Sequence, residues 1–247
     1  MNVTAADGTW SIVTASLING SCLQAQFVGG TPPVLAALTP RLSLAAGATV
    51  SWIVQALVLS NGFAASGQAV AWQTTGSGIS AQGSTASITT STGMATQTLT
   101  VGPLAEGQLA IVNACLNGTS QCVPFTAIGA RSEYAALEAV SGTTQSLSIA
   151  RTPAQITLRL LDMDGNPMAA GSVSLYQALY AWAPPCGPHG VCPPSILLAT
   201  ATATATSALD GTVTFTPASL PGVATNLLAL AASGNTSTVS IAVEQHP

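Results

Sequence analysis

Charge is scarce in this chain of 247 residues. Only 5% of the residues are charged, against roughly 25% in an ordinary globular domain. Four Lys and Arg side chains cannot form the basic surface that a nucleic acid requires, and a net charge of −4 is too small to indicate a cationic partner. A surface made mainly of Ser, Thr, Asn and Gln leaves little repulsion between copies, so the composition favours self-association into a homo-oligomer or filament.

Side chains that could carry out a reaction are also missing. The two histidines are His189, which has no acid nearby in sequence to orient it, and His246, which is the penultimate residue. The eight carboxylates are scattered, mostly in predicted turns or near the ends of predicted domains. We therefore predict that the protein is not an enzyme and uses no cofactor.

Long apolar runs are absent as well. The most apolar region, residues 45–59, is interrupted by Thr49, Ser51 and Gln55 and is too short to span a bilayer. Residues 1–10 have neither the basic start nor the apolar segment of a signal peptide. We predict no membrane span, and we interpret the chain as an internal fragment or a mature product.

What the sequence does contain is a β-hairpin pattern that occurs three times. In the middle copy, the corner glycine Gly107 precedes an alternating strand at 109–116, the turn Asn117-Gly118 and a return strand at 122–128. Asn-Gly predicts a type I′ turn because both residues tolerate positive φ. The other two copies repeat this order of corner, strand, turn and strand. The first copy has the corner Gly8, a strand at 10–17, the turn Asn19-Gly20 and a strand at 22–28. The third copy has the corner Gly222, a strand at 224–231, the turn Gly234-Asn235 and a strand at 237–243.

The spacing of these landmarks indicates a β-sandwich array. Gly8, Gly107 and Gly222 are predicted to be equivalent corners, which lie 99 and 115 residues apart. A second landmark, Asn61-Gly62 ahead of a strand, recurs 103 residues later as Asp164-Gly165. A period of about 100 residues made of short strands and turns is typical of sandwich domains.

These landmarks resemble the bacterial immunoglobulin-like repeats of the invasin/intimin type. The resemblance lies in the order of several motifs, MDGNPMAAGSVSLY, SALDGTVTFTP and PGVATNLLALAASGNTSTVSIAV, and it covers residues 38–129 and 131–245. It implies seven-stranded sandwiches that serve as spacers in cell-surface proteins, and it does not imply an enzyme. We predict an all-β chain of tandem immunoglobulin-like antiparallel β-sandwiches at 37–130 and 131–247, preceded by an N-terminal β-hairpin at 1–36.

Four of the five cysteines form two local pairs. Cys115 and Cys122 flank the Asn117-Gly118 turn on opposing strands, which can bring their Cβ atoms within bridging range. Cys186 and Cys192 bracket the short segment GPHGV. Two such pairs predict disulfides and an oxidising, extracellular or cell-surface location. Zinc is the alternative, but His189 is the one further ligand nearby and no C-x-x-C motif occurs, so we predict no metal site.

The fifth cysteine, Cys22, aligns with Cys122, and its expected partner position holds Ser16. Cys22 is therefore either a buried free thiol or one half of an intermolecular disulfide. The hairpin that carries it contains the last two strands of a repeat. It is either a cut through a longer repeat protein or a segment that completes a sheet in a neighbouring subunit, although neither full domain lacks its own last two strands.

An inserted loop at 177–195 distinguishes the second domain. It contains Tyr180, Trp182, His189, several prolines and the Cys186 pair. Aromatic side chains on a rigid exposed loop lose little entropy on binding, so the loop is a candidate contact surface for a host or matrix protein or glycan. The alternative is a loop that folds back over the sandwich.

Three further patterns have ordinary structural interpretations. Asp162, Asp164 and Asn166 have the spacing of a calcium loop, but Pro167 and Val173 replace its required Gly and Glu, and a turn between strands explains the same residues. The ATATATAT run at 199–206 places Ala on one face of a strand and Thr on the other, solvated face. We also predict that Trp52 and Trp72 lie in the core.

Two classes of function remain. The first is a structural one, in which the chain is a stalk or filament subunit of a bacterial surface assembly. The second is a binding module, an adhesin or carbohydrate-binding domain that uses the loop at 180–194.

Overall fold

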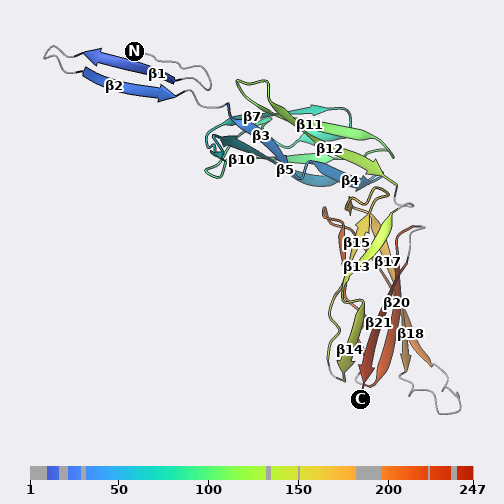
Figure 1. The fold of residues 1–247 in the computed structure, drawn as a ribbon. Coiled ribbons are helices and arrows are strands. Elements are labelled where there is room, and N and C mark those ends of the chain that lie inside the picture. Colours follow the sequence, from blue (N-terminus) through green and yellow to red (C-terminus); the bar gives the residue numbers. More distant parts are fainter. Residues whose placement is uncertain are drawn as a thin grey trace.

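The computed structural model describes residues 10–16, 22–28, 32–131, 135–149, 151–181, 196–221, 223–234 and 238–246 (Figure 1). Every regular element in these ranges is a strand, which confirms the predicted all-β class. The strands form one separate hairpin and two sandwiches, each with a core of its own. No helix that is long and apolar enough to cross a membrane is found in the described ranges.

The N-terminal hairpin consists of β1 (Trp10–Ser16) and β2 (Cys22–Val28), which pair antiparallel. For these two strands the structure describes the backbone pairing alone. Ser16 lies opposite Cys22, as the alignment with the middle hairpin predicts. Within the described residues, β1 and β2 pair with no other strand.

The first sandwich has two sheets. One has the order β3-β5-β10-β8 with β6 on β5, and the other has the order β4-β12-β11-β7-β9. Their strands are β3 (Val34–Leu38), β4 (Arg41–Ala45), β5 (Val50–Ser60), β6 (Phe63–Ala64), β7 (Ala69–Thr75), β8 (Ile79–Ala81), β9 (Ala86–Ile88), β10 (Met94–Val101), β11 (Leu109–Leu116) and β12 (Cys122–Ala130).

The second sandwich repeats this plan with sheets β13-β15-β19 and β14-β21-β20-β17-β18. Its strands are β13 (Ala136–Ser141), β14 (Thr144–Ser148), β15 (Ile156–Leu161), β16 (Met168–Ala169), β17 (Ser172–Ala181), β18 (Leu197–Thr206), β19 (Thr212–Phe215), β20 (Thr225–Ala232) and β21 (Val239–His246).

The two sandwiches share one topology. The order β3-β5-β10 corresponds to β13-β15-β19, and β4-β12-β11-β7 corresponds to β14-β21-β20-β17. In both, an early strand pairs in parallel with the last one, β4 with β12 and β14 with β21, while most other pairs are antiparallel. The chain is therefore a tandem of immunoglobulin-like sandwiches, as the recurring sequence landmarks predict.

Alternating apolar residues of facing strands fill the core of the first sandwich. Trp52 on β5 and Trp72 on β7 are 4% and 2% exposed, so their predicted core positions are confirmed. Both rings contact Phe125 on β12, with centroids 6.2 Å and 5.8 Å from it. The Trp72 indole N–H donates to Ser87 Oγ at 2.8 Å, which satisfies its polar atom in the interior.

The turn of the middle hairpin differs from the prediction. Gly118 has a φ of +78°, but Asn117 is not among the described residues with positive φ, so the turn is not type I′. The backbone N–H of Thr119 donates to Leu116 O at 3.2 Å, which gives a type II turn within a loop at 117–121. A two-residue type I′ turn would require Asn117 to adopt the left-handed conformation, and the longer loop does not require it.

Asn61-Gly62 is the dipeptide that does form the type I′ turn. Asn61 and Gly62 have φ values of +52° and +81°, and they connect β5 directly to β6. In the matching Asp164-Gly165, Gly165 alone has positive φ. The two landmarks thus occupy equivalent places between strands with different local turns.

Candidate functional site at the domain junction

The two sandwiches are joined by strand pairing as well as by the chain itself. β16, from the second sandwich, adds to the sheet of the first by pairing in parallel with β4. Met168 lies opposite Ser43, and Ala169 lies opposite Leu44. Figure 1 shows the long axes of the sandwiches meeting in an elbow at this point.

Each core also contains a residue that comes from the other sandwich. Ala169 of the second sandwich is buried in the core of the first, and Ala45 of the first is buried in the core of the second. Ala48 packs against both cores. Rotation about the elbow therefore requires that buried apolar contacts and backbone hydrogen bonds break together, so we expect one preferred angle.

A buried serine holds β16 in place. The Ser207 hydroxyl donates to Met168 O at 2.6 Å and accepts from the Gly171 N–H at 2.9 Å. The Ser207 backbone accepts from the Ala170 N–H and donates to Gly171 O, both at 2.9 Å. Four bonds to one short segment fix its position against the sheet, and Ser207 itself is 6% exposed.

The first sandwich contains the same arrangement. The Thr89 hydroxyl donates to Ala65 O at 2.6 Å and accepts from the Gln68 N–H at 2.9 Å. Ala65 and Gln68 precede Met168 and Gly171 by 103 residues, which is the spacing predicted from Asn61 and Asp164. The predicted correspondence of this part of the two repeats is therefore confirmed at the level of individual hydrogen bonds.

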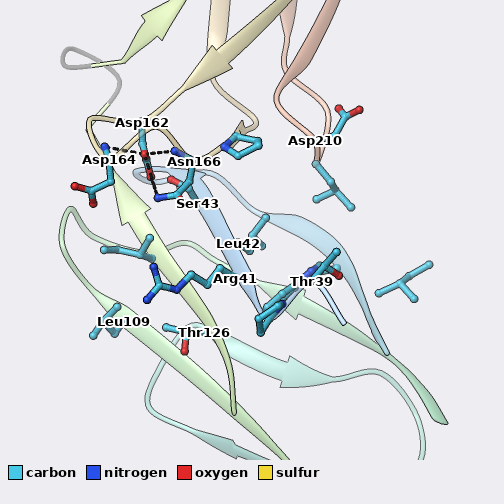
Figure 2. A pocket seen from close by; sticks show the side chains of 16 residues that line it. Thr39, Arg41, Leu42, Ser43, Leu109, Thr126, Asp162, Asp164, Asn166 and Asp210 are labelled. Carbon is cyan, nitrogen blue, oxygen red and sulfur yellow. Dashed lines mark hydrogen bonds between the residues drawn. The ribbon is translucent and has the colours of Figure 1, made fainter. Parts of the chain in front are cut away.

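A groove of about 790 Å³ opens beside the elbow (Figure 2). The first sandwich supplies one wall from β4, β5, β11 and β12, and the second sandwich supplies the other from the turn at 162–167 and from Leu209 and Asp210. Apolar side chains such as Ile53, Leu109 and Leu209 are 43–56% exposed along it. The volume of this groove is in the range of small-ligand sites, so it is a candidate binding surface.

Six of the charged residues that the structure describes lie at the elbow of this charge-poor chain. The groove is lined by Arg41, Asp162, Asp164 and Asp210, and an adjoining pocket of about 300 Å³ adds Glu106 and Arg131. These are six of the twelve Lys, Arg, Asp and Glu residues. Arg131 forms an ion pair with Glu106, and both side chains are about half exposed.

Asp162 shapes the wall of the groove rather than offering a free carboxylate. Its Oδ1 accepts from the backbone N–H groups of Asp164 and Asn166 at 2.9 Å and 2.8 Å. The Asn166 side-chain amide donates to both Asp162 oxygens at 3.2–3.3 Å (Figure 2). Asp162 is 6% exposed. These bonds are those of a turn closed by an Asp, which is the second of the two interpretations of the Asp162-Asp164-Asn166 spacing.

Asp210 is an acid on the groove rim that is stabilised in its ionised form by hydrogen bonds. The Thr212 hydroxyl donates to Asp210 Oδ1 at 2.6 Å, and the Thr212 backbone N–H donates to the same oxygen at 3.0 Å. These two bonds lower the pKa of Asp210 below its ordinary value, with a smaller contribution from the positive charge of Arg159. Asp210 therefore keeps a negative charge on the groove rim under mildly acidic conditions.

The predicted disulfide residues lie at the other end of the first sandwich. Cys115 and Cys122 are directly opposite each other on β11 and β12, and a disulfide joins them. The loop at this end is tied to β3, because the Gln121 side chain accepts from the Leu35 N–H at 3.2 Å. The disulfide therefore fastens the hairpin tip and does not contribute to the groove.

Tyr180 is not in a loop, contrary to the sequence interpretation. It lies near the end of β17, opposite Asn226 of β20 and Leu197 of β18. The strand continues to Ala181 because Tyr180 and Ala181 still pair with Asn226 and Thr225 of β20. Trp182, Cys186, His189 and Cys192 lie outside the described residues, and the inserted segment begins after 181 rather than at 177.

The first sandwich begins earlier than predicted, and one of the three corner glycines lies among the described residues. β3 begins at Val34 and pairs with β5, so the first sandwich includes residues before the predicted start at 37. Gly107, with a φ of +71°, turns the chain ahead of β11. Gly8 and Gly222 lie outside the described residues, so their equivalence to Gly107 stays a prediction.

Comparison with known proteins gives no family assignment. No family model matches the chain, and no curated protein does. Among solved structures, the D0-D1 domain of intimin is 18% identical with a TM-score of 0.35, covering 87% of this chain and 98% of that one. The adhesin InvE of Yersinia pseudotuberculosis is 14% identical with a TM-score of 0.31, covering 87% and 59%. Native alpha-2-macroglobulin of Escherichia coli is 14% identical with a TM-score of 0.32, covering 96% and 16%.

Domains of the intimin and invasin type are thus among the structures to which this chain is similar, as its sequence motifs predict. The chain spans less than two thirds of InvE and a small part of alpha-2-macroglobulin. The immunoglobulin-like architecture stands on the strand order of the two sandwiches. Likeness of this degree carries no conclusion about activity or partners.

Proposed function

We propose that this chain is an extracellular structural protein, a stalk or filament subunit of a bacterial surface assembly built from immunoglobulin-like repeats. In this role it holds two modules at a set angle. The observation that carries the proposal is the pairing of β16 with β4, which makes the second sandwich part of a sheet of the first. A flexible tether between independent modules has no need for such a shared sheet.

Two further observations fit this role. Ser207 makes four hydrogen bonds to the segment 168–171, which contains β16, so the element that joins the modules is held in place. The Cys115–Cys122 disulfide closes the tip of the β11–β12 hairpin, which suits a protein in an oxidising, extracellular environment. A charge-poor surface favours contacts between copies, so we include self-association in the proposal.

The experiment measures the elbow directly. Spin labels are attached at Thr96→Cys on β10 and Ser240→Cys on β21, both at exposed positions, in a Cys22→Ser background. Pulsed dipolar spectroscopy should give one narrow distance distribution for the full chain. A broad distribution, no narrower than that of the same labels after five glycines are inserted between Arg131 and Ala135, would contradict a rigid structural role.

A binding module that uses the loop at 180–194 is the alternative. Tyr180 lies near the end of β17, just before the inserted segment, and Ile196 and Leu197, which follow that segment, are 59% and 52% exposed, so the strand ends beside it carry an apolar surface. Tyr180→Ala with Trp182→Ala should abolish attachment to host cells or to a glycan array if the loop is the contact. An adhesive protein that keeps full attachment with both changes does not bind through this loop.

A further inference from the structure

β18 is an unusually long edge strand, with no further strand paired to its outer side in the part of the chain that the structure describes. It is the last strand of the sheet β14-β21-β20-β17-β18 and contains ten residues. Setting aside the separate β1–β2 hairpin, the other described sheets end in strands of two to six residues, and the opposite edge of this sheet, β14, has five. An edge strand presents a row of backbone N–H and C=O groups that can pair with another chain.

The sequence of β18 itself contains none of the usual features that prevent such pairing. Natural edges are interrupted by charge, proline, bulges or short length. The edge strand β13, for example, contains Glu138 and a register shift near Ser141. β18 contains no charge and no proline, and neither does β17 beside it. Its one irregularity lies at its start, opposite Leu179 and Tyr180, so residues 199–206 form a regular edge.

The ATATATAT run makes this edge complementary to itself. When two copies of a period-two strand pair antiparallel about a two-fold axis at Thr202, Thr204 lies opposite Thr200 and Ala203 lies opposite Ala201. Ala then faces Ala on the inner side, where Ala203 and Ala205 already pack against the core. Thr faces Thr on the outer side, where Thr202 is exposed and lies opposite Tyr176 of β17. Cross-strand Thr pairs are favourable neighbours.

Apolar residues extend the surface at one end of the edge. Ile196, Leu197 and Leu198 are 59%, 52% and 49% exposed. In the antiparallel arrangement, this end of each copy lies beside the end of the other copy's strand near Thr206. Pairing therefore adds apolar burial to the backbone hydrogen bonds, and no like charges on the two strands oppose it.

From these observations we propose that two copies of this chain associate through β18, antiparallel and about a two-fold axis near Thr202. The two five-stranded sheets then become one continuous sheet. The proposal names the edge through which copies associate, so it rests on the self-association included in the proposed function, whereas the elbow is complete within one copy and is tested separately by the spin-label distances. A second copy is the partner that the edge fits, since the strand is complementary to its own sequence.

The test uses the full chain and two variants with the same substitution on opposite edges of one sheet. Thr202→Lys places two positive charges opposite each other at the axis, and Thr144→Lys places one on the exposed face of β14 as a matched control. Analytical ultracentrifugation should show a concentration-dependent dimer for the wild type. We expect T202K to raise the dimer dissociation constant at least about tenfold and T144K to leave it unchanged. Circular dichroism checks that both variants are folded.

A charge exchange identifies the partner strand. T202K mixed with T202E should recover the dimer as a heterodimer, because opposite charges then meet at the axis. A wild type that stays monomeric at every concentration would overturn the proposal. So would a T202K dimer as stable as the wild type, or loss of the dimer without recovery in the mixture, which would indicate that β18 pairs with another segment such as the N-terminal hairpin.

Discussion

Gly93 and Gly211 occupy the same backbone position in successive sandwiches, with φ values of +74° and +75°. The Gly93 carbonyl accepts from the Val58 N–H at 2.8 Å, and the Gly211 carbonyl accepts from the Leu160 N–H at 2.8 Å. A Cβ atom on either glycine would lie 2.6 Å or 2.5 Å from the carbonyl oxygen of that same partner. Each turn thus requires a residue with no side chain, for steric as well as conformational reasons.

Alanine at these glycines should therefore destabilise each sandwich more than alanine at an open turn. Gly62→Ala is the control, because Gly62 has a φ of +81° but nothing within 4 Å of its added Cβ. We expect about 1–2 kcal/mol for Gly62→Ala from the left-handed backbone alone. Gly93→Ala should cost about 1–3 kcal/mol more because of the clash. Urea unfolding measures the difference, and equal losses would show that the turn relaxes freely.

Ser207→Ala should loosen the elbow, whereas Thr89→Val should not. Each change removes a buried hydroxyl that makes two hydrogen bonds, so each should destabilise its own sandwich by about 1–3 kcal/mol. Ser207 holds the segment that pairs with the other sandwich. The spin-label distance distribution should therefore broaden in Ser207→Ala alone, and equal broadening in both variants would argue against this role of Ser207.

Thr212→Val should raise the pKa of Asp210 toward its ordinary value. The variant removes the hydroxyl bond, which is the largest cause of the lowered pKa, and leaves the backbone N–H bond in place. A lowered folded-state pKa stabilises the fold above the unfolded-state pKa, and this contribution is lost as the pH falls through the folded-state pKa. Carboxyl-carbon NMR titration of Asp210 measures the shift. An unchanged pKa would assign the effect to the backbone bond.

Removing the disulfide should destabilise the first sandwich without unfolding it. Cys115 and Cys122 are seven residues apart, so the bridge restricts a short loop of the unfolded chain and contributes about 2–3 kcal/mol. Cys115→Ser with Cys122→Ser should therefore lower the thermal midpoint, as should a reductant acting on the wild type. A reductant that lowers the midpoint of the double variant just as much would point to a different disulfide.

Local patterns predicted the repeat well because the same short-range requirements recur in each module. The alternation of β11 and the 103-residue offset between the Asn61 and Asp164 turns both follow from strand and turn chemistry within a few residues. Gly93 and Gly211 end equivalent turns for the same reason. These strands and turns can be predicted from the sequence because each depends on residues only a few positions away.

The junction could not be predicted in this way. Leu42, Ser43, Leu44 and Ala45 of β4 are all buried, so the strand lacks the alternation that signals a half-exposed sheet. One face of β4 is covered by the first sandwich, and the part near the elbow is also covered by the second sandwich. This burial arises only when the two sandwiches are packed together. The groove likewise combines side chains from segments that lie up to 171 residues apart, Thr39 and Asp210 among them. The gathering of six charged residues at one place is visible only in the joined modules.

The parallel pairs β4–β12 and β14–β21 have a mechanical consequence. Each connects an early strand of a sandwich to its last one, so tension applied along the chain pulls the paired strands in opposite directions along their length. The hydrogen bonds between them are then loaded in shear, and they resist together instead of opening one after another. Resistance to pulling is governed by the rate of unfolding rather than by equilibrium stability. A chain with this strand arrangement should therefore resist sudden pulling along its length, whatever its equilibrium stability.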